Sequence, residues 1–418
     1  MPMPLPRCQR QADGRDSGRA WSMVVAAFIG GFVVFGVLYS FGVFFGSMAA
    51  EFHADRTATS AFFSITNCCF YLFGSVTGRL SDRFGPRITV ATGAVVMGVG
   101  LVLTACIGQM WIGYLTYGLG VGLGASCAYI PTLAVVGGWF DRQRNTAMGI
   151  AATGTGFGTL AIPPLAATLI QAYGWRVTDL VLGSGCFVLL CIAAAIVAPP
   201  PVVSSPAGRP LRRIVLSPAF LVLYLSWVCA TIALLVPLVF LPAFAREHGV
   251  APVAASALLS LLGGMGILGR VGIGVLASKV GTLRLFKISV AVMAASYLLW
   301  LPFTGYGWLL AFVAVLGLGY GVRISVMPVV LIEVFGSENL GAVFGIFFTA
   351  SAASALGGPL LAGLVIDVTG SYLWGIAFAL ALGIVGFAVV VPLKVQRRPQ
   401  DDTAGITAIP KAGAVVSK

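Results

Sequence analysis

The chain has 418 residues, of which 59% are hydrophobic and only 9% are charged, and its formal net charge is +12. Its mean hydropathy is +1.00. A soluble protein of this length needs far more polar surface, so the composition excludes a soluble enzyme or binding module and indicates a polytopic membrane protein.

Apolar stretches long enough to cross a bilayer recur along the chain. They follow a polar segment, residues 1–20, that we expect to be a disordered cytoplasmic tail. A helix of about 20 residues spans the hydrocarbon core of a membrane, so each stretch is predicted to be a transmembrane helix. The twelve stretches lie at about 21–50, 58–78, 88–107, 111–137, 145–170, 179–198, 218–244, 253–277, 286–303, 308–332, 341–366 and 371–392.

One long polar connection divides these stretches into two sets of six. It spans residues 199–217 and is rich in Pro, Ser and Arg, whereas the other connections are short. We therefore expect an all-α membrane protein with twelve transmembrane helices in two six-helix bundles. The expected parts are a bundle at 21–198, a cytoplasmic linker at 199–217, a bundle at 218–392 and a cytoplasmic tail at 393–418.

The basic residues are distributed unevenly between the two sides of the membrane. Of the 25 Lys and Arg residues, 20 fall in the tails and the connections on the same side as the tails, and only Arg56, Arg176 and Arg246 fall on the other. The positive-inside rule then places both termini in the cytoplasm, and the protein is expected in the plasma membrane, as in a bacterial inner membrane. The charge is loop charge facing lipid headgroups, which argues against a nucleic-acid partner.

The two remaining basic residues, Arg270 and Arg323, are the single charges of two apolar stretches, 254–277 and 308–332. A charge at such a depth costs about 2.5–3.5 kcal/mol on insertion scales, so it tends to face a protein interior or a watery cavity. Tyr320 precedes Arg323 by three residues and shares its helical face. The face around Arg270 is made of glycines: Gly263, Gly266 and Gly274.

The acidic residues offer these arginines no partner in the sequence-based assignment. All 13 Asp and Glu residues are assigned to connections or to the boundaries of apolar stretches, Asp179 among them at the outer boundary. Two uncompensated buried cations are costly, and a cavity that admits an anion resolves this. The planar guanidinium group suits a carboxylate, because it can bind both oxygens. The alternative is that each arginine bonds helix carbonyl groups and is structural.

Further candidate contacts for an anion are polar groups at similar depth. Tyr39 lies in the first stretch, and Asn67 and Tyr71 lie four residues apart on one face of the second. Each could donate a hydrogen bond to an anion, and each could equally bond a neighbouring helix. Trp227 is interpreted as a packing residue.

A loop motif occurs twice, half a chain apart. GRLSDRFGPR begins at residue 78 and GVLASKVGTLR at residue 274, and four positions match at an offset of 196 residues. This indicates two parallel six-helix repeats. The first copy resembles the signature loop of the major facilitator superfamily, which implies that fold. There Asp82, Arg83 and Arg87 could latch one conformation at the cytoplasmic face; a solvated turn is the alternative.

Longer segments resemble the monocarboxylate porter branch of that superfamily, which includes the oxalate–formate exchangers. They are WSMVVAAFIGGFVVFGVLYSFGVFF from residue 21, WFDRQRNTAMGIAATGTGFGTLAIPPL from residue 139 and VIDVTGSY from residue 365. The resemblance implies that Arg270 is the substrate-binding arginine. Three family features differ: Gly266 replaces an acid, Tyr39 lies near the place of a lysine, and the acidic start of the first-helix signature is missing, with only Trp21 kept.

These observations predict a secondary transporter of small organic anions, mono- or dicarboxylates, that works by alternating access. The alternatives are a proton-coupled monocarboxylate symporter and a facilitator-type exporter of drugs or sugars. We expect no catalytic residues, metal, cofactor or obligate protein partner, since the membrane region holds no acid–base cluster. Without a membrane acid to carry a proton, anion exchange or facilitated movement is favoured over proton symport.

Overall fold

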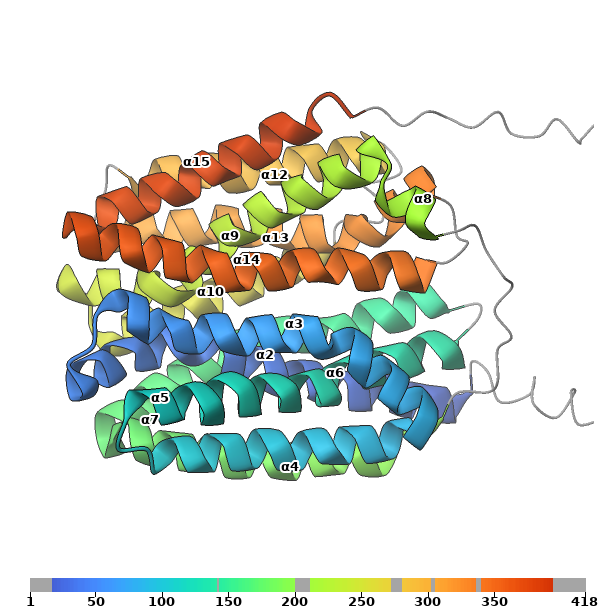
Figure 1. Ribbon diagram of the computed structural model, residues 1–418, viewed down its shortest axis with the longest axis horizontal. Coiled ribbons are helices and arrows are strands. Elements are labelled where there is room, and N and C mark those ends of the chain that lie inside the picture. Colours follow the sequence, from blue (N-terminus) through green and yellow to red (C-terminus); the bar gives the residue numbers. More distant parts are fainter. Residues whose placement is uncertain are drawn as a thin grey trace, which may run out of the picture.

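The computed structural model describes residues 17–140, 143–199, 211–271, 280–301, 305–335 and 340–393. Long helices lie side by side with their axes nearly parallel (Figure 1). They are α2 (Gly18–Phe52), α3 (Arg56–Phe84), α4 (Pro86–Ala105), α5 (Met110–Gly113), the π-helix η1 (Tyr114–Val121), α6 (Gly122–Trp139), α7 (Arg144–Ile196), α8 (Leu211–Val215), α9 (Pro218–Glu247), α10 (Pro252–Val271), α12 (Thr282–Trp300), α13 (Tyr306–Phe335), α14 (Leu340–Thr369) and α15 (Tyr372–Val390).

The helices coincide with the predicted apolar stretches. In the described part of the chain, ten are long and apolar enough to cross a membrane. One of these, α7, covers two predicted stretches. A break in the backbone at Gly174 separates them, where φ is +79°, a value that glycine adopts at little cost. The other predicted stretch is α3, which is less apolar because its middle contains several Ser, Thr and Asn residues. Each of the twelve stretches is therefore helical over most of the residues that the structure describes, while twelve crossings of the membrane stay a prediction.

Some boundaries differ from those expected. Helix α2 begins at Gly18, inside the segment expected to be disordered, because the Ser17 side chain accepts a hydrogen bond from the Ala20 N–H and caps it. The expected linker contains the short helix α8. The division into two bundles at 199–217 stays a prediction.

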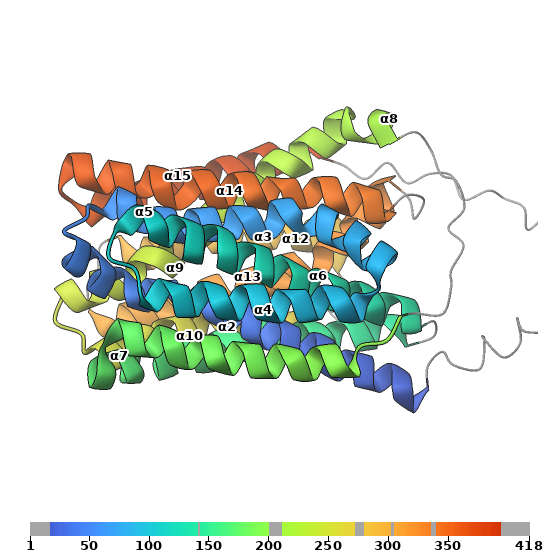
Figure 2. The ribbon, with the colours of Figure 1, turned by 60° about the horizontal axis from the view of Figure 1, so that its bottom comes forward.

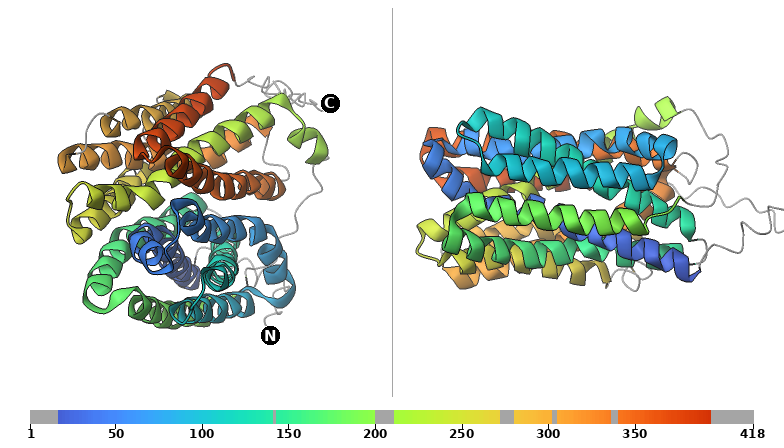
Figure 3. Two further views of the ribbon diagram at one scale, coloured as in Figure 1. Left: turned by 60° about the vertical axis from the view of Figure 1, so that its left-hand side comes forward. Right: turned by 90° about the horizontal axis from the view of Figure 1, so that it is seen from below.

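The helices before and after residue 200 form two groups, lower and upper in the left view of Figure 3. Glycine allows neighbouring helices to touch within each group. A Cβ atom at Gly158 of α7 would lie 2.1 Å from the Phe32 carbonyl oxygen of α2. One at Gly321 of α13 would lie 2.2 Å from the Gly266 carbonyl oxygen of α10. Such backbone contact is typical of helices packed in membranes.

The two groups meet mainly along three pairs of helices, α3 with α14, α7 with α10, and α2 with α9, and α2 also contacts α10. Figures 1 and 2 show α14 running alongside α3. We call the end of the bundle that carries the connections at 53–55, 106–109 and 248–251 the outer end, following the predicted orientation, and the opposite end the inner end.

Polar contacts join the two groups at the outer end. The Asp367 carboxylate accepts hydrogen bonds from the Arg56 N–H (3.2 Å), the Thr57 N–H (2.8 Å) and the Thr57 hydroxyl (2.6 Å), so it caps α3 from α14. The Arg56 side chain also pairs with Glu247 at 3.2 Å, and the Tyr372 hydroxyl donates to the same oxygen at 3.1 Å. We call these five residues the outer-end network.

Candidate functional site

Arg270 lies where α10 crosses α7, at the contact between the two groups of helices. Glycines bring the helices together there: a Cβ atom at Gly263 would lie 2.8 Å from Cβ of Thr159. The Arg270 Nη1 atom donates to the Ala152 carbonyl oxygen (2.7 Å) and to the Thr155 hydroxyl (2.6 Å). Its Nε atom is buried and has no partner in the described part of the structure. Arg270 thus joins the two groups while keeping unused donor capacity.

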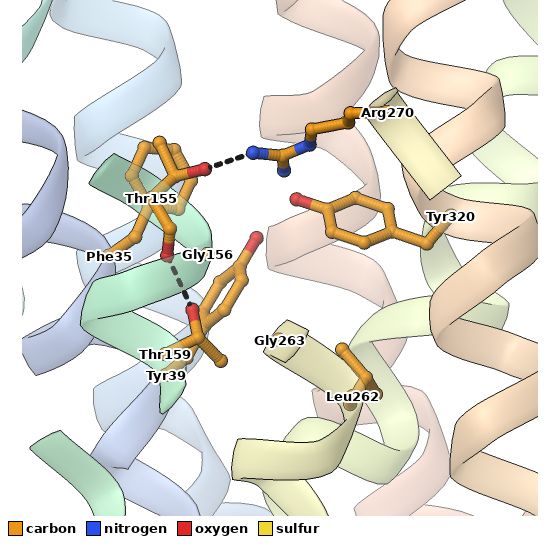
Figure 4. Close-up of a pocket in the computed structure, with 9 residues that line it drawn as sticks. All are labelled: Phe35, Tyr39, Thr155, Gly156, Thr159, Leu262, Gly263, Arg270 and Tyr320. Carbon is orange, nitrogen blue, oxygen red and sulfur yellow. Dashed lines mark hydrogen bonds between the residues drawn. The ribbon is translucent and has the colours of Figure 1, made fainter. Parts of the chain in front are cut away.

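A small cavity lies beside this arginine (Figure 4). Its volume is about 10 Å³, measured as the space open to the centre of a water molecule, which is room for about one water. In Figure 4 the Tyr39 and Tyr320 hydroxyls point toward the Arg270 guanidinium, and its carbon atom lies 5.7 Å from the centre of the Tyr320 ring. The lining residues are Phe35, Tyr39, Thr155, Gly156, Thr159, Leu262, Gly263, Arg270 and Tyr320.

Arg323 is only 1% exposed and lies within the second group of helices. Its guanidinium carbon lies 4.2 Å from the centre of the Trp227 ring, and its Nη1 atom donates to the Thr231 hydroxyl at 3.1 Å. Its Nε atom is buried and has no partner among the described residues. Trp227 therefore does more than pack, since it covers one face of this cation and hydrogen-bonds Ser351 through its indole N–H at 2.8 Å.

Tyrosine side chains connect the surroundings of the two arginines. The hydroxyls of Tyr39, Tyr71 and Tyr320 interact electrostatically with one another and with Arg323. Tyr320 also faces Arg270, so the sequence-predicted contacts from α2, α3, α10 and α13 converge. The two arginines therefore border one region that is lined by tyrosine hydroxyls.

Two residues of this region were missed in the sequence. Tyr129 of α6 interacts electrostatically with Arg270 and Tyr320, and its ring packs against Phe35. Thr155 of α7 bonds Arg270 directly. Both lie in apolar stretches where a tyrosine or threonine has no distinctive spacing, and only the WFDRQRN segment leading into α7 pointed to that helix.

Asn67 is buried, but its amide is partly used within its own helix. Its Nδ2 atom donates to the Phe63 carbonyl oxygen at 3.0 Å, while its Oδ1 atom has no partner in the described structure. Asn67 is not among the residues that line the cavity, and one of its two amide hydrogens is already used within α3.

The predicted latch lies at the inner end. Arg83 is exposed, with its guanidinium carbon 5.3 Å from the centre of the Phe84 ring, and Arg87 is exposed at the start of α4. The Asp82 side chain lies outside the described residues, as does Ser278 of the second loop copy. The latch therefore stays a prediction.

The sequence pattern assigns Asp179 to the outer boundary of an apolar stretch, but its side chain is buried inside the bundle. Asp179 is 0% exposed, and neither of its oxygens has a hydrogen-bond partner among the described residues. The hydropathy boundary was misleading, because the helix resumes directly after Gly174 and includes the polar WRVTD segment. Asp179 lies apart from the cavity, so the arginines still have no carboxylate partner in the described part of the chain.

The described residues hold no group of three or more His, Cys, Asp or Glu side chains that could bind a metal. What the site offers is two guanidinium groups with unpaired donors near several phenol hydroxyls, Arg270 at the contact between the two groups of helices and Arg323 within the second group. Such an arrangement can bind an anion and release it to either side when the groups move apart.

Comparison with known proteins identifies the family. The model of the Major Facilitator Superfamily matches residues 27–322 and 271–418. Monocarboxylate transporter 13 of Bos taurus is 32% identical over 393 residues, covering 92% of this chain and 91% of the relative. The chain belongs to the Major Facilitator Superfamily, on its monocarboxylate transporter-like branch. This confirms the resemblance seen in the sequence.

Further relatives carry the same family name, and a solved structure has the same fold. Monocarboxylate transporter 12 of Xenopus laevis is 26% identical, covering 92% of both chains. Monocarboxylate transporter 3 of Rattus norvegicus is 29% identical, covering 87% of this chain and 77% of the relative. Among solved structures, a bacterial homologue of the human lysosomal transporter Spinster, in an inward-facing and unoccupied conformation, matches with a TM-score of 0.73 at 13% identity. The match covers 90% of this chain and 97% of the solved chain, and it supports the fold alone.

Proposed function

We propose that this membrane transporter carries small organic anions, mono- or dicarboxylates, by alternating access between its two groups of helices. The observation that carries the proposal is the Arg270 side chain, which bridges α10 and α7 beside the cavity and retains a buried Nε donor with no partner among the described residues. A carboxylate can take up that donor and replace the bonds to Ala152 and Thr155 when the groups separate.

Arg323 supports a second contact in the same region. It is buried, has a Nε atom unpaired within the described structure and interacts with the tyrosines that face the cavity. We propose that it attracts a second negative charge, which favours dicarboxylates or bulkier acids. Tyr39, Tyr71 and Tyr320 would donate hydrogen bonds from their hydroxyls, and Asn67 would need to rotate its amide to do so.

Substrates of the opposite charge fit less well. A cationic drug would call for an acid in the cavity, and the lining residues include none. The named relatives are monocarboxylate transporters, which supports an anionic substrate for this chain. An exporter of uncharged sugars remains the second candidate, favoured by the hydroxyl groups of the lining.

The decisive experiment is uptake of labelled lactate and succinate by proteoliposomes. We expect Arg270→Lys to lose at least about 90% of uptake of both, because an ammonium group cannot make the two parallel bonds of a guanidinium. Arg284→Lys, at an exposed arginine of α12, is the matched control and should transport normally. Wild-type uptake by a folded Arg270→Lys variant would overturn the proposal.

We also propose that both termini are cytoplasmic and that the protein resides in the plasma membrane, as in a bacterial inner membrane, from the distribution of basic residues. Reporter fusions at residues 205 and 250 should then report opposite sides of the membrane. A report of the same side from both would refute the orientation.

A further inference from the structure

The buried carboxyl group of Asp179 has no role in the anion site. Asp179 lies five residues after the break at Gly174, so it is about 7.5 Å along the helix axis from the outer end of this part of α7. Neither oxygen is exposed or hydrogen-bonded within the described residues. An ionised carboxylate in that setting is so costly that the group takes up a proton instead.

The surroundings of Asp179 supply no cation in this conformation, as far as the structure describes them. The groups that interact with it electrostatically are the Tyr117 hydroxyl of η1 and the Cys186 thiol of α7 itself, and the Tyr117 hydroxyl is also buried without a partner there. Helix α4, which packs against α7, has its only charged residue, Arg87, at the inner end. No described residue around Asp179 therefore neutralises its negative charge in this conformation, and a bound proton does so instead.

Arg176 lies three residues before Asp179 on the same face of the helix, but its guanidinium group binds other residues. Arg176 pairs with Glu51 of α2 through two bonds, from Nη2 at 2.7 Å and Nε at 3.2 Å, and its Nη1 atom donates to the Ala105 carbonyl oxygen at 2.7 Å. Residues at positions i and i+3 of a helix are neighbours, so Arg176 can reach Asp179 once Glu51 releases it.

We propose that Asp179 is a proton-binding site, occupied in this conformation, and that Arg176 exchanges Glu51 for Asp179 when the site releases its proton. The O–H bond of the carboxyl group breaks, the proton passes to water at the outer end, and the carboxylate pairs with the Arg176 guanidinium. In the reverse step, water delivers a proton and Arg176 returns to Glu51.

This site is linked to the anion site through α2. Glu51 lies in the last turn of α2, and Tyr39 of the same helix lines the cavity. Tyr117 packs between Phe41 of α2 and Phe62 of α3, with ring centres 5.6 and 6.2 Å away. If the end of α2 moves away from this part of α7 during transport, the Glu51–Arg176 pair breaks and the proton is released. The inference goes beyond the proposed function and holds whichever anion Arg270 binds.

The test is infrared spectroscopy of the full-length protein in lipid nanodiscs, titrated with pH. The difference spectrum between the parent and Asp179→Asn isolates the carbonyl band of a protonated carboxyl group, which shifts in heavy water. We expect this band in the parent at neutral pH. In Glu51→Gln, which frees Arg176, we expect its titration midpoint to fall by at least about one pH unit, a tenfold change in proton affinity.

The design separates a proton site from a structural acid. Asp402→Asn, in the C-terminal tail, should leave the band unchanged. If the parent and Asp179→Asn spectra coincide at neutral pH, Asp179 is ionised and the proposal is wrong. If the band is present but its midpoint is the same in Glu51→Gln and the parent, the exchange of partners by Arg176 is wrong. Glu51→Gln keeps the proposal testable even if Asp179→Asn fails to fold.

Discussion

The outer-end network should hold the two groups of helices together, and Asp367→Asn tests this directly. The carboxylate accepts three hydrogen bonds from Arg56 and Thr57 across the contact between groups. Asparagine keeps one acceptor oxygen but removes the charge and sets an NH₂ group against N–H donors. Losing one charge-assisted bond costs about 1.5–3 kcal/mol, which corresponds to an increase of about 10- to 150-fold in the population open at the outer end.

The assay is the rate at which a soluble maleimide modifies a cysteine introduced by Ser60→Cys. Ser60 is 0% exposed and its hydroxyl bonds the Pro359 carbonyl oxygen of α14, so a thiol there reacts only when α3 and α14 separate. In a background without other cysteines, the rate should rise at least about tenfold in Asp367→Asn, since reclosing is fast relative to modification.

Asp55→Asn is the matched control for this experiment. Asp55 caps the same helix, accepting a hydrogen bond from the Ala58 N–H at 2.6 Å, but it belongs to the same group of helices as α3. Its replacement should leave the labelling rate of the introduced cysteine within about twofold of the parent, because no contact between the groups is lost. If Asp367→Asn also stays within that range, the network does not hold the outer end closed.

Three further predictions concern the helices around the cavity. Gly321→Ala should lower the midpoint of thermal unfolding, because its Cβ atom would lie 2.2 Å from a backbone oxygen, whereas Gly185→Ala, with no atom within 4 Å, should leave it unchanged or raise it. Tyr320→Phe should weaken carboxylate binding about 5- to 10-fold in ligand-stabilisation assays, since it removes one hydroxyl donor worth about 1–1.5 kcal/mol; unchanged binding would exclude that contact. Arg323→Gln should weaken succinate binding more than lactate binding, and an equal effect on both would assign Arg323 a structural role.

The sequence predicted the helices and the location of the two arginines inside the bundle, because both follow from local patterns. A charge in a stretch of apolar residues stands out without knowledge of the fold, and the glycines around Arg270 indicated a close approach of another helix. The structure adds what approaches: α7, with Thr155 bonded to the guanidinium group. That contact joins residues 115 positions apart, which no periodic pattern encodes.

The burial of Asp179 and the pairing of residues in the outer-end network could not be predicted from the sequence, for a related reason. Hydropathy assigns a polar residue near a boundary to the surface, yet the turn at Gly174 places Asp179 inside the bundle. Arg56, Glu247 and Asp367 lie in three separate connections or helix ends, and each looks like an ordinary loop charge. Their pairing depends on how the two groups of helices meet, and this is a property of the whole fold.

The backbone contact between α10 and α13 has a consequence for selectivity. Gly269 and Gly321 leave no side-chain layer between these helices, so neither can slide or tilt against the other without a clash. Arg270 and Arg323 are carried by these two helices and must therefore move together. If both bind substrate, the distance between their Cα atoms is the same whether the transporter faces outward or inward. The protein would then select anions by the separation of their charges, and the selected length would be the same for uptake and for release.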